Sequence, residues 1–187
     1  MNRYRNLFAP KTKRFLLFFF AISPWISACS ENSPLPEPPI SVPFSLEDIG
    51  SRIEKDFRVV DHNVYYFRLS FAYEDGNQID RARVKKLMGE HELDKFGNVV
   101  RPGVKTPIRL AIFSMGASAY KLVYETESNP FLTSWDGNSF GKNIGHTVLP
   151  PGHYRIRLEN LRNAPEFLGT PVTFVIWRNP KSNFKPK

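Results

Sequence analysis

Alternation of hydrophobic and polar positions is the clearest pattern along this chain. From Tyr65 to Tyr73 every second residue is aromatic or leucine, whereas the positions between them are mixed in polarity. Successive side chains of a strand point to opposite faces of a sheet, so this pattern predicts a half-buried antiparallel strand. The turn-forming residues Asp75-Gly76-Asn77 then predict its end.

Further segments show the same period of two. They are residues 108–112, 120–124, 154–158 and 172–176. The stretch 46–60 allows two interpretations, because its apolar residues also fit one stripe of a helix. Gly50 and the β-branched pair Val59-Val60 favour a strand, and we expect one from Ile53 to Val60.

One segment has the features of a short helix. Asp80 is a suitable N-cap, Ile79 and Val84 are spaced for a hydrophobic staple, and Gly89 is placed to end the helix. Several short strands with one helix and no strand–helix repeat predict a mainly all-β fold, an antiparallel β-sandwich. Its expected core includes Tyr65, Phe67, Leu69, Leu110, Tyr154, Ile156, Phe174 and Ile176.

The N-terminus departs from this pattern. A basic start is followed by an apolar run from Phe15 to Ile22, which is too short to span a bilayer because about 20 apolar residues are needed. The tetrapeptide Ile26-Ser27-Ala28-Cys29 resembles the bacterial lipobox. That resemblance implies a signal peptide over residues 1–28 and lipidation of Cys29. An ordinary secretory signal with a chance cysteine is the alternative.

The resemblance to lipoproteins also implies a location. In enteric bacteria an aspartate after the lipidated cysteine tends to retain a lipoprotein in the inner membrane, and this chain has Ser30 there. We therefore expect palmitate-type acyl chains on Cys29 to hold the protein in the outer membrane, facing the periplasm. The membrane is then a partner through Cys29, and two or three acyl chains would make the anchor permanent.

A proline-rich stretch separates this anchor from the folded domain. Residues 30–43 contain five prolines in fourteen positions, a composition that favours an extended stalk of about 40 Å. The predicted organisation is a signal peptide at 1–28, the lipidated cysteine and linker at 29–43, and a β-sandwich domain at 44–187.

The net positive charge of the chain becomes small once the predicted signal peptide is excluded. Residues 1–28 hold five of the 26 basic residues and none of the 18 acidic ones, so 21 basic residues remain against 18 acidic. This balance is ordinary for a globular domain, and we expect no nucleic-acid partner. Because Cys29 is the only cysteine, the domain has no disulfide.

No segment combines the residues that catalysis requires. Ser139 lies in a G-x-S-x-G pattern from Gly137 to Gly141, but a nucleophile elbow needs a strand before it and a helix after it. Here the residues before Ser139 favour a turn. The four histidines have no metal-ligand spacing, so we expect no catalytic residue, no metal and no cofactor.

The loop from Asn129 to Gly141 contains the candidate binding residues. Phe131, Trp135 and Phe140 lie there among turn formers, and exposed aromatic rings suit recognition of a protein or a sugar. Alternatively, the rings fold back and close one end of the sandwich.

Several stretches resemble an uncharacterised family of proteobacterial lipoproteins that contain a domain of unknown function. The matching stretches are Arg83-Val84 with Leu87 and Gly89, residues 106–110, residues 132–135 and residues 149–154. The resemblance implies the fold and no catalytic residues. The architecture is also similar to periplasmic immunity proteins. We therefore expect a non-catalytic binding protein, an inhibitor or immunity protein against a protein toxin, with a glycan-binding module as the alternative.

Overall fold

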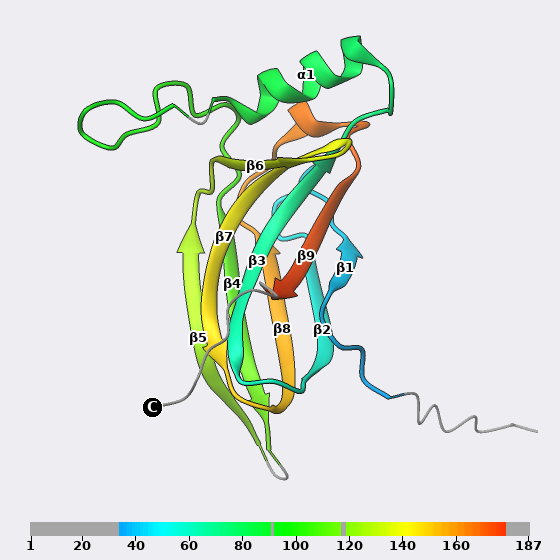
Figure 1. The fold of residues 1–187 in the computed structure, drawn as a ribbon, viewed down its shortest axis with the longest axis vertical. Helices are drawn as coiled ribbons and strands as arrows, with labels where there is room; N and C mark the ends of the chain where they lie inside the picture. The colour runs from blue at the N-terminus through cyan, green and yellow to red at the C-terminus, as the bar shows by residue number, and fades with distance from the viewer. Residues whose placement is uncertain (1–33, 91, 117–118, 179–187) are drawn as a thin grey trace, which may run out of the picture. The chain divides into compact units, whose positions relative to one another are not determined.

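The computed structural model describes residues 34–90, 92–116 and 119–178, which form two antiparallel sheets packed face to face (Figure 1). The strands are β1 (Ile40–Pro43), β2 (Arg52–Val59), β3 (Asn63–Ala72), β4 (Ile108–Met115), β5 (Tyr120–Ser128), β6 (Leu132–Asp136), β7 (Ser139–Leu149), β8 (Gly152–Asn160) and β9 (Val172–Arg178). One sheet has the order β1-β9-β3-β7-β6 and the other β2-β8-β4-β5. The predicted β-sandwich is confirmed.

Strand β3 lies at the centre of the five-stranded sheet and explains the alternation in the sequence. It pairs with β7 on one side and β9 on the other. Its odd-numbered residues from Tyr65 to Phe71 are buried between the sheets, while the residues between them are only half-buried. All eight predicted core residues are buried.

The stretch 46–60, which could have been a helix or a strand, contains the predicted strand, since β2 lies there and pairs with β8. The proline-rich stretch before it differs from expectation, because Ile40–Pro43 form the edge strand β1 and pair with β9. Ile40 is buried, and Pro43 is tolerated because an edge strand leaves one row of backbone groups unpaired. The Arg58 N–H donates to the Pro36 carbonyl at 2.9 Å, so the ordered chain begins before residue 40.

Helix α1 (Gln78–Met88) forms where a helix was expected, but Asn77 rather than Asp80 is its N-cap. The Asn77 Oδ1 accepts from the N–H groups of Ile79 and Asp80 at 3.1 and 3.0 Å. The predicted staple is wrong, since Ile79 is 84% exposed. Asp80 lies in the first turn, where a hydrogen bond from the Glu74 N–H lowers the pKa of its carboxyl group. Gly89 ends the helix as predicted.

The sandwich has two different ends. Asn63 pairs with Leu149 at one end of β3, and Ala72 pairs with Ser139 at the other, about 30 Å away along a strand of this length. Helix α1 crosses the second end, together with β6 (Figure 1). We define the α1 end as α1, residues 89–90 and 92–107, β6, and residues 165–170, which contain the 3-10 helix η1 (Pro165–Phe167).

Candidate functional site

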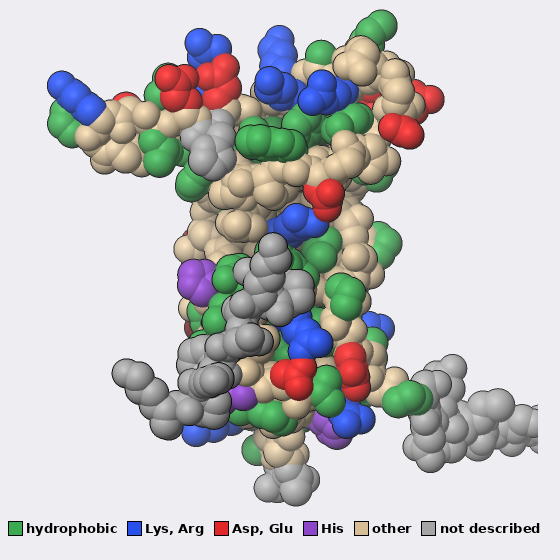
Figure 2. Space-filling view, in the orientation of Figure 1, with side chains coloured by type: hydrophobic (Ala, Val, Ile, Leu, Met, Phe, Trp, Pro, Cys, Tyr) green, Lys and Arg blue, Asp and Glu red, His purple; other side chains and the backbone are tan. Residues whose placement is uncertain are grey.

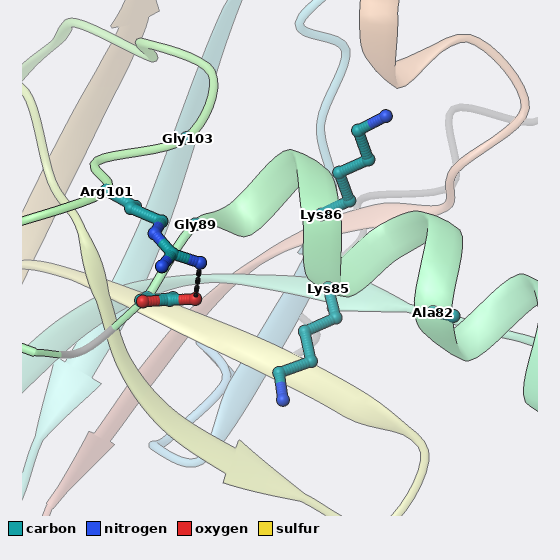
Figure 3. Close-up of a pocket in the computed structure, with 7 residues that line it drawn as sticks. Ala82, Lys85, Lys86, Gly89, Arg101 and Gly103 are labelled. Atoms are coloured by element: carbon teal, nitrogen blue, oxygen red, sulfur yellow. Dashed lines mark hydrogen bonds and ion pairs between the residues drawn. The ribbon is translucent and has the colours of Figure 1, made fainter.

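A groove separates α1 from the edge strand β6. Its hollow of about 340 Å³ is lined by Arg81, Lys85, Gly89, Glu90, Glu92, Leu132, Trp135 and Phe140. A second hollow of about 360 Å³ shares Lys85, Gly89 and Glu90 with the first and also contacts Lys86 and Arg101 (Figure 3). We call the two hollows together the α1–β6 groove. Its floor is apolar on the β6 side and its α1 wall is basic.

The amphipathic character of α1 produces that basic wall. Val84 and Met88 are buried in the core and Leu87 packs against it, whereas Arg81, Lys85 and Lys86 are exposed. Among the residues that the structure describes, Arg81, Lys85 and Lys86 have no ion-pair partner, whereas Arg83 pairs with an aspartate one turn away. Lysine and arginine side chains accordingly gather over α1 in Figure 2. The wall therefore carries uncompensated positive charge.

Two glycines hold the segment after α1 against the helix. Gly89 and Gly103 both have positive φ, at 79° and 66°. A Cβ on Gly89 would lie 2.2 Å from the Arg101 carbonyl oxygen and 2.5 Å from the Gly103 nitrogen. The Val104 N–H donates to the Leu87 carbonyl at 2.8 Å across this crossing. Only glycine fits such an approach of two backbones, so this crossing fixes one wall of the groove.

Residues 92–100 project from this crossing as a small hairpin. Leu93 and Val99 form an antiparallel bridge. The Asp94 carboxylate accepts from the backbone N–H groups of Phe96 and Asn98 at 2.8 and 2.9 Å, and such bonds lower the pKa of Asp94. The Phe96 side chain is exposed at the turn. The projection thus exposes an apolar side chain at its tip.

Lys142 lies beneath the groove and is fully buried. Its Nζ donates to the Val104 carbonyl at 2.8 Å and contacts the Thr106 Oγ1 at 3.4 Å. The rings of Phe71 and Phe167 each have their centroid 5.8 Å from the Nζ. Burial lowers the pKa of Lys142 to about 8. Through these contacts Lys142 connects β7 with residues 104–106.

Sequence reasoning missed Lys142, although the sequence carried a signal. Phe140, Lys142 and Ile144 alternate along β7, and all three are buried. A lysine flanked at period two by such residues occupies an inward position. Because the side chain is enclosed, its role here is structural.

The three predicted binding residues separate into different environments. Trp135 is 69% exposed on β6 and lines the groove. Phe140 is only 4% exposed and packs on Tyr73, with ring centroids 5.2 Å apart. Phe131 is half-buried. The recognition-surface interpretation therefore fits Trp135, and the alternative of rings that close the sandwich fits Phe140, which shares the inward face of Phe71.

Ser139 begins a strand rather than a helix. Gly137 and Asn138 form the two-residue turn between β6 and β7, and the Ser139 hydroxyl donates to the Asp136 carbonyl at 3.2 Å. The geometry of a nucleophile elbow is thus absent. Within the described ranges no three His, Cys, Asp or Glu side chains cluster as metal ligands. Cys29 and His91 lie outside the described residues.

Within the described structure, charged residues on the outer face of the four-stranded sheet form ion pairs, unlike the cations of the basic wall. Arg155 donates two hydrogen bonds to Asp56, at 2.6 and 2.7 Å, and these lower the pKa of the Asp56 carboxyl group. Arg157 donates to Glu54 at 2.8 Å, and Arg109 lies 3.3 Å from each of two glutamates. Four acidic residues of this face are therefore already bound to arginines: Glu54, Asp56, Glu127 and Glu159.

Comparison with known proteins identifies a family and a structure of similar fold but assigns no activity. No curated protein matches the chain. A crystal structure of a protein from Sulfurospirillum deleyianum is similar, with a TM-score of 0.65 and 23% identity over 76% of this chain and 98% of the other. In the described part of the chain, no helix has the length and apolar character that a membrane crossing requires. The family model for a domain of unknown function, DUF5625, matches residues 41–178, and the chain belongs to this family.

Proposed function

We propose that this protein is a non-catalytic binding protein of the bacterial cell envelope and that the α1 end is its binding surface. The observation that carries this proposal is the exposed Trp135 ring beside Arg81 and Lys85, two cations without an ion-pair partner in the described structure. Tryptophan and arginine are the residues that most often dominate the binding energy of protein interfaces. Such a group has no evident role in stabilising the sandwich itself.

The distribution of exposed apolar side chains supports the same surface. The four most exposed large hydrophobic residues of the described chain all lie at the α1 end: Ile79, Phe96, Trp135 and Leu168. Exposed apolar surface concentrated on one part of a protein is typical of interaction sites. The partner best suited to this mixture of aromatic, aliphatic and basic groups is a protein, as for an inhibitor or immunity protein against a toxin.

A second part of the proposal concerns the attachment of the protein to the cell envelope. We propose that the protein is a proteobacterial lipoprotein, attached through Cys29 to the outer membrane and facing the periplasm. Pro36 is bound to Arg58 near the Val59 end of β2, and Val59 pairs with Gly152 at the end opposite α1. The first described residues therefore lie near the end of the sandwich opposite α1.

A glycan-binding module is the second candidate, and the exposed Trp135 ring is the observation that favours it. An exposed indole offers an apolar face on which a sugar ring can stack. However, the burial of Phe140 removes that ring from any stacking platform with Trp135. The basic wall and the exposed aliphatic residues favour a protein partner.

Affinity capture tests the binding proposal. The full chain, in mild detergent, serves as bait in an envelope extract, and captured proteins are identified by mass spectrometry. We expect one protein whose capture is lost with Trp135→Ala and retained with Leu122→Ala, an exposed residue of β5. A glycan array is run in parallel. Glycan binding without a protein partner would establish the second candidate, and binding of neither would contradict both.

Metabolic labelling tests the anchor separately. Cells grown with a palmitate analogue should label the wild-type chain, and Cys29→Ala should abolish both the label and recovery in the membrane fraction. A Cys29→Ala variant that still carries the label would contradict lipidation at this residue.

A further inference from the structure

We infer that the α1–β6 groove accepts an extended acidic segment of a protein partner, which adds as a strand to the free edge of β6. The inference rests on the proposed function and specifies the chemistry of the partner. Three independent features of the groove lead to it: an open backbone edge, a basic wall and an apolar floor.

The backbone edge is open at Trp135. Strand β6 pairs only with β7 in the described structure. Asp136 and Ser139 close the two-residue turn, and the next pair is Trp135 with Phe140. In a hairpin of this kind the closing pair is hydrogen-bonded and the next pair is not, so the Trp135 N–H and C=O point away from β7. These groups can form ladder hydrogen bonds with an added strand.

The basic wall determines which strand fits. Arg81 and Lys85 face the groove without counter-ions, while Glu90 is held by Arg101 at 2.7 Å and only Glu92 remains to offset them. This leaves a net positive lining that attracts carboxylates. Opposite charge across a partly desolvated interface favours both encounter and correct register.

The other sheet edges fit an acidic strand less well. Strand β5 has a bulge opposite Ile112 and Phe113 and carries the exposed Glu125, which would repel carboxylates. Strand β2 has its Arg58 N–H occupied by Pro36. Strand β1 has four residues and ends in proline. Among the described edges, β6 combines free backbone groups with unpaired cations.

The apolar floor of the groove favours a particular order of side chains in the bound segment. Leu132, Trp135 and Phe140 supply apolar surface under the basic wall. An added strand directs alternate side chains to opposite faces. A segment that alternates acidic and aliphatic residues can therefore direct aliphatic side chains to this floor.

A synthetic peptide tests the inference directly. A short fluorescein-labelled peptide of alternating Glu and Val is titrated with the detergent-solubilised full chain, and binding is followed by fluorescence polarisation. We expect saturable binding that is about tenfold or more weaker with Trp135→Ala or Lys85→Glu. Lys121→Glu, an exposed lysine of β5, is the matched control and should leave affinity unchanged.

Two altered peptides separate charge from strand addition. A peptide of alternating Lys and Val should not bind, and a Glu–Val peptide N-methylated at alternate residues should bind about tenfold or more weakly because it lacks one row of N–H donors. Hydrogen exchange supplies a second measurement, since the Trp135 amide should become protected when the unmodified peptide binds.

Several results would overturn the inference. They are no binding of the Glu–Val peptide at millimolar concentration, equal binding of the Lys–Val peptide, equal binding of the N-methylated peptide, or an unprotected Trp135 amide in the complex. If a captured protein still depends on Trp135 while the peptide results are negative, the proposed function stands and strand addition is wrong.

Discussion

The outer face of the four-stranded sheet and the α1 end are both rich in charge, but they differ in how that charge is paired. On the sheet, Arg155 and Arg157 from β8 meet Asp56 and Glu54 from β2 across adjacent strands. At the α1 end, Lys85 has no counter-ion within the described structure. A count of charged residues would not distinguish the two surfaces, whereas their pairing does.

The difference follows from local geometry. Directly opposed residues on neighbouring strands have Cβ atoms about 5 Å apart, so opposite charges on β2 and β8 meet without distortion. Helix α1 lies at the end of the sandwich with one face buried, and its exposed residues have no directly opposed strand residues of the kind that pair β2 with β8. The charges of the sheet face are satisfied within the fold, whereas Arg81, Lys85 and Lys86 at the α1 end are exposed to solvent.

The largest expected effect concerns the crossing that shapes the α1 end. Gly89→Ala should lower the free energy of unfolding by about 3 kcal/mol or more, because the new methyl group would meet backbone atoms at 2.2 Å. Gly50→Ala is the control, since Gly50 also has positive φ but open space around it, and should cost about 1 kcal/mol. Urea unfolding of the full chain measures both, and equal costs would contradict the account of the crossing.

The buried lysine should make stability depend on pH. The pKa of Lys142 is about 8 in the fold and 10.5 as its ordinary value, so between these values the unfolded chain binds more protons and stability rises with pH. From pH 8 to about pH 9.5 the gain should be about 2 kcal/mol, and Lys142→Met should abolish it.

The upper limit of that range is chosen to exclude tyrosine titration. Burial raises the pKa of Tyr65 and Tyr154, and this acts in the opposite direction at higher pH. Urea unfolding at several pH values measures the slope. A wild-type slope equal to that of Lys142→Met would contradict the enclosed environment of Lys142.

A smaller effect is expected on the paired face. Asp56→Asn should lower the free energy of unfolding by about 1 kcal/mol at neutral pH, because it weakens a two-bond contact with Arg155. The pKa of Asp56 is lowered in the fold, so its contribution is present above the ordinary carboxyl pKa and is lost as pH falls through the folded value. Wild type and variant should converge in stability at acid pH, and a constant difference would contradict this assignment.

The smallest effect on stability is expected at the basic wall. Lys85→Ala and Arg81→Ala should each change the free energy of unfolding by less than about 0.5 kcal/mol, since neither residue has an ion-pair partner in the described structure. Arg155→Ala is the matched change on the paired face and should cost more. Thermal unfolding measures all three, and a large loss at Lys85 would indicate a structural role instead.

Sequence patterns predicted the sandwich because period-two alternation reports directly on burial, as β3 shows. The same patterns predicted less where contacts between distant segments determine the local structure. Ile40–Pro43 form a strand despite the prolines because β9 offers an edge, and Asn77 rather than Asp80 caps α1 because of local geometry. Trp135 and Phe140 were equivalent in the sequence, and they lie opposite each other on one face of the β6–β7 pair. Their exposure differs because β6 is the edge strand whereas β7 lies inside the sheet.

The most direct test of the α1 end as the binding surface is site-specific photo-crosslinking in living cells. A photoreactive phenylalanine analogue is placed at Trp135, and in a second strain at Leu122 on the opposite sheet, both of which are exposed. The account predicts a discrete crosslinked protein from position 135 and none from position 122. A product from position 122 alone, or none from position 135 when the partner is present, would contradict it.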